Sequence, residues 1–140
     1  MQANDEEGPL RIRGRAELQD YIDQFNGRNY ARQIRYYAPD VEYKVGALTL
    51  AAPQQIADFY SDFHQYCREF VEIGQFAMTG NVVACTMPSH FEPYRDYEKN
   101  GLKYTAGDVI DIVSFIFYTL KYGQIHRIRV ARYNGTRNDF

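Results

Sequence analysis

The second half of the chain constrains the fold most, because it consists of long apolar segments separated by tight turn signals. We expect strands over residues 69–79, 82–92, 108–121 and 124–133. Gly80-Asn81 and Tyr122-Gly123 lie between such segments and are typical of short hairpin turns. Since strands joined by short turns pair antiparallel, the pattern predicts a sheet of long antiparallel strands.

The first half of the chain supplies helices. Helical spacing predicts an amphipathic helix over 15–26, with an apolar stripe of Leu18, Tyr21, Ile22 and Phe25. A second, short helix is expected over 30–37, capped by Asn29, and a third over 53–68. Two short strands are expected between them, over 41–45 and 47–51.

This order of elements predicts an α+β fold, in which a curved antiparallel or mixed sheet wraps as a cone around three N-terminal helices. We expect one domain over residues 10–133, with flexible tails at 1–9 and 134–140. A cone of this kind leaves a pocket. The 13 Tyr and 9 Phe residues of the chain suit either a dense core or the lining of such a cavity.

Composition argues against several classes of protein. The formal net charge of the 140 residues is −2, which disfavours a nucleic-acid binder that relies on bulk charge. No segment is apolar for the roughly 18 to 20 residues that a membrane span needs. The polar start resembles no signal peptide, and Cys67 and Cys85 form no disulfide framework, so a cytoplasmic location is expected. Neither a metal-ligand spacing nor a glycine-rich nucleotide loop is present, so no metal or cofactor is expected.

Four stretches together resemble the nuclear-transport-factor-2-like superfamily, including its SnoaL-like polyketide cyclases and ketosteroid isomerases. They are YAPDVEY (37–43), PQQIADFY (53–60), GDVIDIVSFIFY (107–118) and YGQIHRIRVARY (122–133). The resemblance covers most of residues 15–133 and implies the cone-shaped fold. Because proteins with this scaffold have many different activities, the resemblance implies a small-molecule pocket more firmly than any particular reaction.

The ketosteroid isomerases are the most informative relatives. Their resemblance places Tyr21 at the tyrosine that stabilises an enolate oxyanion, and Tyr37 and Tyr60 at its supporting tyrosines. The catalytic Asp of that family corresponds to Val45, and its neutral carboxylic acid corresponds to Phe115. Steroid isomerisation is therefore not expected.

Strand alternation with this resemblance assigns the inner face of 108–121 to Val109, Asp111, Val113, Phe115, Phe117 and Thr119. A buried Asp111 would have a raised pKa and would suit general acid or base chemistry. The alternative is that Asp111 lies at the rim in solvent, paired with an arginine. On the last strand, His126, Ile128, Val130 and Arg132 are expected to point inward, where His126 could meet Asp111. On the strand over 82–92, the residues expected to point inward are Val83, Cys85, Met87, Ser89 and Phe91.

We therefore predict Tyr21, Asp111 and His126 as catalytic residues. The predicted substrate-binding residues are Tyr37, Tyr43, Tyr60, His64, Cys85, Met87, Phe115, Phe117 and Arg132. For His64 the competing interpretation is a satisfied core histidine, and for Cys85 a small core residue.

The predicted function is a cofactor-independent enzyme that moves a proton in a small, apolar, oxygenated molecule, as a cyclase, isomerase or dehydratase (lyase) does. Two alternatives are an epoxide hydrolase and a non-catalytic dimeric module that binds an apolar ligand. A pocket without an ionisable group deep inside would favour the binding module. The second apolar face of 108–121, with Ile110, Ile112, Ile116 and Leu120, predicts a homodimer.

Overall fold

The structure, a computed structural model, describes residues 8–135 and 139. Its helical elements are α2 (Arg15–Asn26), α3 (Tyr30–Gln33), the 3₁₀ helix η1 (Ile34–Tyr36) and α4 (Pro53–Phe63). Its strands are β1 (Tyr37–Val45), β2 (Leu48–Ala51), β3 (Cys67–Val71), β4 (Phe76–Thr79), β5 (Val82–Pro93), β6 (Tyr97–Lys99), β7 (Leu102–Tyr104), β8 (Ile110–Lys121) and β9 (Gln124–Arg132). None of the described helices is long and apolar enough to cross a membrane.

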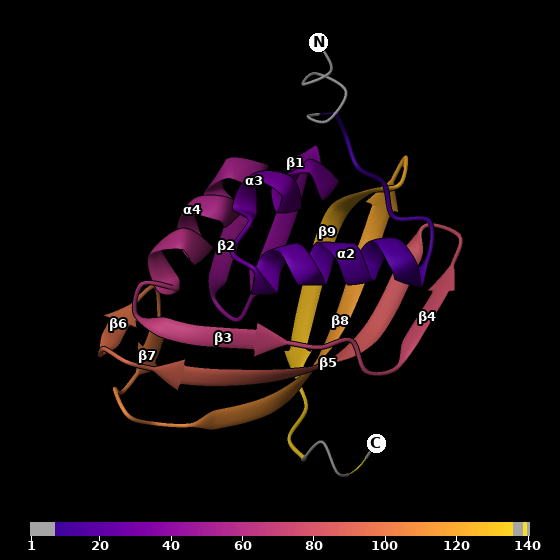
Figure 1. Ribbon diagram of the computed structural model, residues 1–140. Helices are drawn as coiled ribbons and strands as arrows, with labels where there is room; N and C mark the ends of the chain where they lie inside the picture. Colours follow the sequence, from indigo (N-terminus) through magenta and orange to yellow (C-terminus); the bar gives the residue numbers. More distant parts are fainter. Residues whose placement is uncertain (1–7, 136–138, 140) are drawn as a thin grey trace.

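Seven strands form one curved mixed sheet, in the order β2-β1-β9-β8-β5-β3, with β4 paired to β5. The β1–β9 pair is parallel, and the other pairs are antiparallel. The sheet bends around α2, α3 and α4, which lie on its concave side (Figure 1). The predicted α+β cone around three helices is confirmed.

The first helix follows its apolar stripe, since Leu18, Tyr21, Ile22 and Phe25 are all buried. It matches the predicted bounds of 15–26. Asn29 caps the second helix by accepting a hydrogen bond from the backbone N–H of Arg32 at 3.2 Å. That helix ends in a 3₁₀ turn, and β1 begins at Tyr37, earlier than the sequence predicted.

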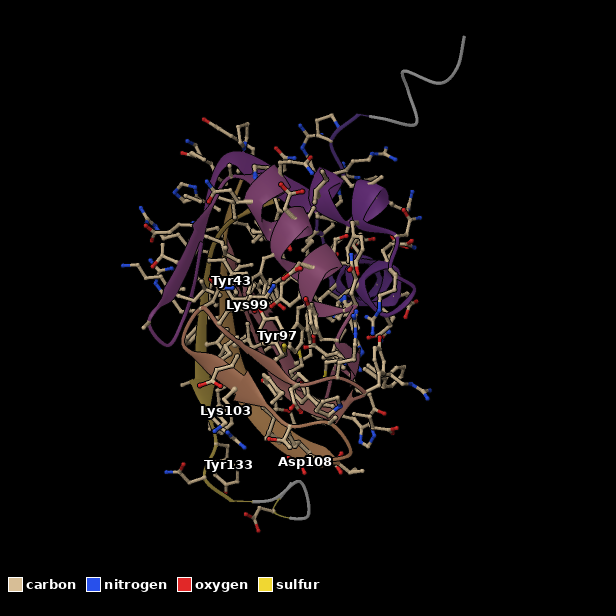
Figure 2. The ribbon with its side chains drawn as sticks, turned by 90° about the vertical axis from the view of Figure 1, so that its left-hand side faces the viewer. Tyr43, Tyr97, Lys99, Lys103, Asp108 and Tyr133 are labelled. Carbon is tan, nitrogen blue, oxygen red and sulfur yellow. The ribbon has the colours of Figure 1, made fainter. Side chains whose placement is uncertain are left out.

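Three predicted elements differ from those observed. α4 ends at Phe63 rather than at residue 68, because Cys67 continues the helical spacing only by coincidence and starts the alternating strand β3. The segment 69–79 contains parts of two strands, β3 and β4. The predicted loop 93–107 contains the β6–β7 hairpin, which lies at the side of the molecule that faces the viewer in Figure 2. Much of the predicted flexible tails, 1–7, 136–138 and 140, lies outside the described residues.

The predicted inner face of β8 is wrong. Ile112, Ser114, Ile116 and Tyr118 line the concave side, whereas Phe115 and Phe117 are exposed on the convex side. Both faces of β8 are apolar, so alternation defined two faces without saying which is inside. The more polar face, which carries Asp111 and Thr119, is the outer one.

A β-bulge reverses the predicted direction of His126 on β9. Thr119 of β8 pairs with Arg127, and the next residue, Leu120, pairs with Ile125, so His126 is an extra residue in the ladder. Ile125 is consequently buried, while His126 lies outside and its Nδ1 is 3.1 Å from Asp40 Oδ1. The bulge is local, and the predicted inward residues Ile128 and Val130 do line the concave side.

Candidate active site

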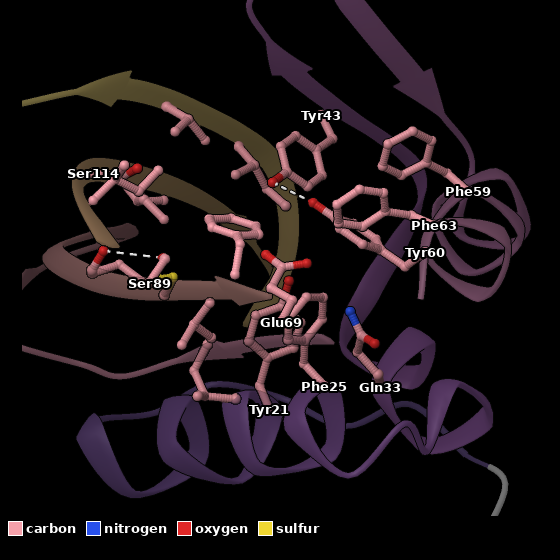
Figure 3. Close-up of a pocket in the computed structure, with 18 of the residues that line it drawn as sticks. Tyr21, Phe25, Gln33, Tyr43, Phe59, Tyr60, Phe63, Glu69, Ser89 and Ser114 are labelled. Carbon is pink, nitrogen blue, oxygen red and sulfur yellow. Dashed lines mark hydrogen bonds between the residues drawn. The ribbon is translucent and has the colours of Figure 1, made fainter. Parts of the chain in front are cut away.

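The concave side of the sheet and the helices form a cavity of about 170 Å³ that is partly open to solvent. Its wall is largely aromatic and aliphatic, with nine polar side chains among the described residues that form it. These are Tyr21, Gln33, Tyr43, Tyr60, Glu69, Ser89, Tyr104, Ser114 and Tyr118. Glu69 is the single residue in this lining with a formal charge (Figure 3).

Glu69 points into the cavity from β3. Only 9% of its side chain is exposed, and its Oε1 atom lies 3.0 Å from His64 Nε2. The other nitrogen of that imidazole, Nδ1, lies 2.6 Å from the hydroxyl of Tyr30. A neutral imidazole with its proton on Nε2 satisfies this chain, because it donates to Glu69 and accepts from Tyr30.

Tyr30 can serve either protonation state of His64. Its hydroxyl lies 3.4 Å from the carbonyl oxygen of Tyr60, to which it can donate when it accepts from an imidazolium Nδ1–H. His64 is buried, and its ring stacks on that of Tyr30 at 5.9 Å between centroids. Glu69, His64 and Tyr30 therefore form a buried hydrogen-bonded chain.

Two pairs of tyrosine hydroxyls lie at the cavity. Tyr43 and Tyr60 are joined at 2.8 Å, and Tyr21 and Tyr37 at 2.7 Å. Burial raises the pKa of Tyr43 to about 12 and the pKa of Tyr21 well above that of free tyrosine. Both side chains therefore stay protonated near neutral pH and are available as hydrogen-bond donors.

Gln33 supports the second pair. Its Nε2 donates to the Tyr37 hydroxyl at 3.0 Å, which leaves that hydroxyl free to donate its own proton to Tyr21. In this arrangement the proton of Tyr21 is available to a molecule in the cavity. The other amide atom, Gln33 Oε1, is buried without a hydrogen-bond partner among the described residues.

Several predicted site residues are found at the cavity. The predicted catalytic residue Tyr21 lines it, as do the predicted binding residues Tyr43, Tyr60 and Met87. Three others are buried beside it without being part of its wall: Tyr37, His64 and Cys85. Burial raises the pKa of the Cys85 thiol to about 11, as it does for Cys67, so neither is a thiolate near neutral pH.

The remaining predicted site residues lie outside the cavity. Asp111 is on the convex face with 60% of its side chain exposed, and its Oδ1 is 2.8 Å from His90 Nδ1. The alternative of a solvated Asp111 describes this placement, but its partner is His90 rather than an arginine. The expected Asp111–His126 contact is absent among the described residues, since His126 contacts Asp40 instead. Phe115, Phe117 and Arg132 are exposed and do not line the cavity.

Sequence reasoning missed the cavity's polar groups on β3 and β8, namely Glu69, Ser114 and Tyr118. A signal for Glu69 exists in CREFV, where it lies between Cys67 and Val71 at a spacing of two. The predicted helix over 53–68 includes Cys67 and Arg68, the first two residues of β3, and therefore obscures this alternation. No group of three His, Cys, Asp or Glu side chains that could hold a metal occurs in residues 8–135 and 139.

Comparison with known proteins identifies the fold. No protein-family model matches the chain, and no curated protein matches it significantly. A candidate polyketide cyclase from Xanthomonas campestris pv. campestris superposes with a TM-score of 0.69 at 20% identity, over 81% of this chain and 84% of that one.

Two further solved structures share this fold at lower identity. A ketosteroid isomerase-like protein from Catenulispora acidiphila, in complex with trimethylamine, gives a TM-score of 0.67 at 12% identity, covering 81% of this chain and 82% of that one. An epoxide hydrolase from M. tuberculosis gives 0.67 at 10% identity, covering 83% and 79%. The chain thus has the nuclear-transport-factor-2-like fold that its sequence resembles.

Proposed function

We propose that the protein is an enzyme that moves a proton in a small, largely apolar, oxygenated molecule bound in the cavity. The observation that carries the proposal is Glu69, a buried carboxylate in an otherwise uncharged wall, with its Oε1 held by His64. A buried ionisable group at this place is costly, and such groups concentrate at active sites. The enzymes of this fold named above support the assignment to a catalyst.

Glu69 acts as the general base on a carbon next to a carbonyl group. It takes the proton, the C–H electron pair forms a C=C bond, the π pair of the C=O bond moves onto oxygen, and an enolate forms. The hydroxyl of Tyr21, supported by Tyr37, donates to that oxygen. Return of the proton from Glu69 to another carbon gives isomerisation. Its transfer to a hydroxyl group that leaves as water gives dehydration, and attack of the enolate carbon on a second carbonyl, whose oxygen takes the proton, gives cyclisation.

The two alternatives fit the cavity less well. An epoxide hydrolase of this fold needs a carboxylate pair and an arginine around a water molecule, but the described lining has one carboxylate and no arginine. A purely apolar binding module would have no ionisable group deep inside. Glu69 is such a group, so catalysis is favoured.

The isomerisation of cyclohex-3-enone to the conjugated cyclohex-2-enone tests the proposal, because absorbance follows the reaction and the substrate has one ring. Glu69→Gln keeps the shape and removes the base, so we expect kcat to fall by about 10² to 10⁴. Asp111→Asn makes the same chemical change on the convex face and should leave kcat unchanged. Absence of turnover by the wild type, or equal turnover by Glu69→Gln, would overturn the assignment.

We also propose that a second copy of the chain covers the convex face. The predicted dimer face is wrong, since its residues Ile110, Ile112, Ile116 and Leu120 point to the concave side. On the convex side, Phe115 and Phe117 are 42% and 58% exposed. Arg127 and Arg129 lie toward one end of this face and Asp111 toward the other, so a two-fold axis would bring opposite charges together.

Sedimentation tests the dimer. The wild type should sediment as a dimer at micromolar concentration, and Phe117→Glu should sediment as a folded monomer. A monomeric wild type would contradict the proposed dimer without affecting the proposed reaction.

We also propose a reducing, cytoplasmic location for the protein. Both cysteines, Cys67 and Cys85, are free and buried, which supports this proposal.

A further inference from the structure

The size and the charge of the cavity together narrow the class of molecule that it can hold. Resting on the proposed function, we infer that the ligand is a single-ring molecule without negative charge that carries a hydroxyl or keto group. We further infer that Tyr104 limits the size of the part that the cavity holds. Carboxylic acids and molecules that need more than one ring inside the cavity are thereby not expected as ligands.

Volume sets the number of rings. The cavity holds about 170 Å³. A closed apolar cavity of about 150 Å³ in another protein accommodates benzene. The space here therefore suits one six-membered ring with small substituents, and a molecule of three or four fused rings does not fit inside it.

The β6–β7 hairpin forms one part of the cavity wall. Leu102 and Tyr104 of this hairpin line the cavity. The Tyr104 ring packs in this wall, with its centroid 5.3 Å from that of Phe63 and 5.7 Å from that of Phe91. Truncation of Tyr104 would enlarge the cavity on this side.

The hairpin is held firmly against the body of the protein. Tyr97 is 1% exposed, and its ring packs on Phe63 and Tyr66 at centroid distances of 5.1 and 5.3 Å. Lys99 forms an ion pair with Asp62 of α4 at 2.9 Å. Moving the hairpin aside to admit a larger ligand would break these contacts. The folded protein therefore keeps this part of the wall in place.

Charge sets the chemical class. Glu69 would repel an anionic ligand, and no lysine or arginine is among the described residues of the lining. One carboxylate oxygen already accepts from His64, so the other can accept from a ligand hydroxyl. Tyr118 and Ser114 make no side-chain hydrogen bond within the described residues and can donate to a ligand oxygen.

Calorimetric titration with phenol, 2-naphthol and the phenolic steroid estradiol tests the size limit. We expect phenol to bind, 2-naphthol to bind at least tenfold more weakly, and estradiol not to bind. Tyr104→Ala should tighten 2-naphthol at least tenfold while phenol still binds, which also shows that the variant is folded. Lys103→Ala, an exposed neighbour in the same hairpin, should change neither affinity.

A second series holds the ring constant and varies the charge, with benzyl alcohol and benzoate at pH 7. Benzyl alcohol should bind at least tenfold more tightly than benzoate. Binding of benzoate as tight as that of benzyl alcohol, or binding of estradiol, would overturn the inference. These measurements need no turnover, so a wrong ligand class and a failure of Glu69 as the base give different results.

Discussion

The hydroxyl of Tyr36 holds α2, and with it Tyr21, in place at the cavity. Tyr36 is buried, and its hydroxyl donates to Asp20 Oδ2 at 2.5 Å. Arg32 donates to the same oxygen at 2.9 Å, so the cluster joins α2 to α3 and η1. Tyr36→Phe removes only the hydroxyl and keeps the ring against Tyr21.

A hydrogen bond to a charged group contributes about 1.5 to 3 kcal/mol. Because 29% of the Asp20 side chain is exposed, water can replace part of the contact, and we expect the lower end. A loss of about 1.5 kcal/mol in the free energy of unfolding corresponds to a Tm lower by roughly 5 °C in a chain of this size.

The loss should depend on pH in one direction. Burial raises the pKa of Asp20, but hydrogen bonds from Tyr36, Gln24 and Arg32 outweigh burial and lower it. A lowered folded-state pKa adds stability above the unfolded pKa of about 3.9, and this stability is lost as the pH falls through the folded value. The difference between wild type and Tyr36→Phe should therefore be full at pH 7 and shrink below about pH 4.

Urea unfolding followed by circular dichroism at pH 7 and pH 3 measures both effects. Tyr122→Phe is the matched control, because Tyr122 is 85% exposed and its hydroxyl has no partner among the described residues. It should unfold like the wild type. An unchanged midpoint for Tyr36→Phe at pH 7, or a penalty that grows on acidification, would refute the reasoning.

Three further predictions concern other parts of the chain. Hydrogen bonds to Glu92 and Asp111 raise the pKa of His90, so the Tm advantage of wild type over His90→Gln should be present at pH 5.5 and lost as the pH rises through the raised value. Gly74→Ala would place a Cβ atom 2.3 Å from Thr86 Oγ1, so the free energy of unfolding measured in urea should fall by about 1 to 3 kcal/mol. The double variant with Thr86→Ala should recover part of this loss. Tyr30→Phe removes the hydrogen-bond partner of His64 Nδ1, so it should lower the free energy of unfolding by about 1 to 3 kcal/mol. It should also lower kcat on cyclohex-3-enone more than it changes KM. An unchanged kcat would show that Tyr30 takes no part in catalysis.

Periodicity predicted the elements well where a single apolar stripe was unambiguous. The stripe of α2 gave its bounds, and the inward residues of β5 were predicted as found, including Met87, Ser89 and Phe91. On β8 both faces are apolar, so the same method could define the two faces but not choose between them. Asp111 was placed inside by resemblance, although its charge was a physical reason to place it outside.

The site was harder to predict because it depends on features without a local signature. The bulge at His126 is a property of the β8–β9 pairing, and no spacing within β9 reveals it. The contact between His64 and Glu69 joins residues on either side of a helix end that periodicity misplaced. Tyr30, from another helix, completes the chain only after the fold has formed.

Relocation of the carboxylate is what separates this cavity from the isomerases that the sequence resembles. In those relatives the base corresponds to position 45, at the end of β1, where this chain has Val. Glu69 instead comes from β3, and β1 and β3 lie far apart in the strand order of the sheet. Tyr21, in contrast, keeps its place on α2 and its bond to Tyr37. If the carbonyl oxygen is held by the same tyrosine while the base approaches from another wall, the proton must leave from a different direction relative to the ring. The placement of the tyrosines and of Glu69 therefore agrees with our proposal of proton transfer, on a different and smaller molecule.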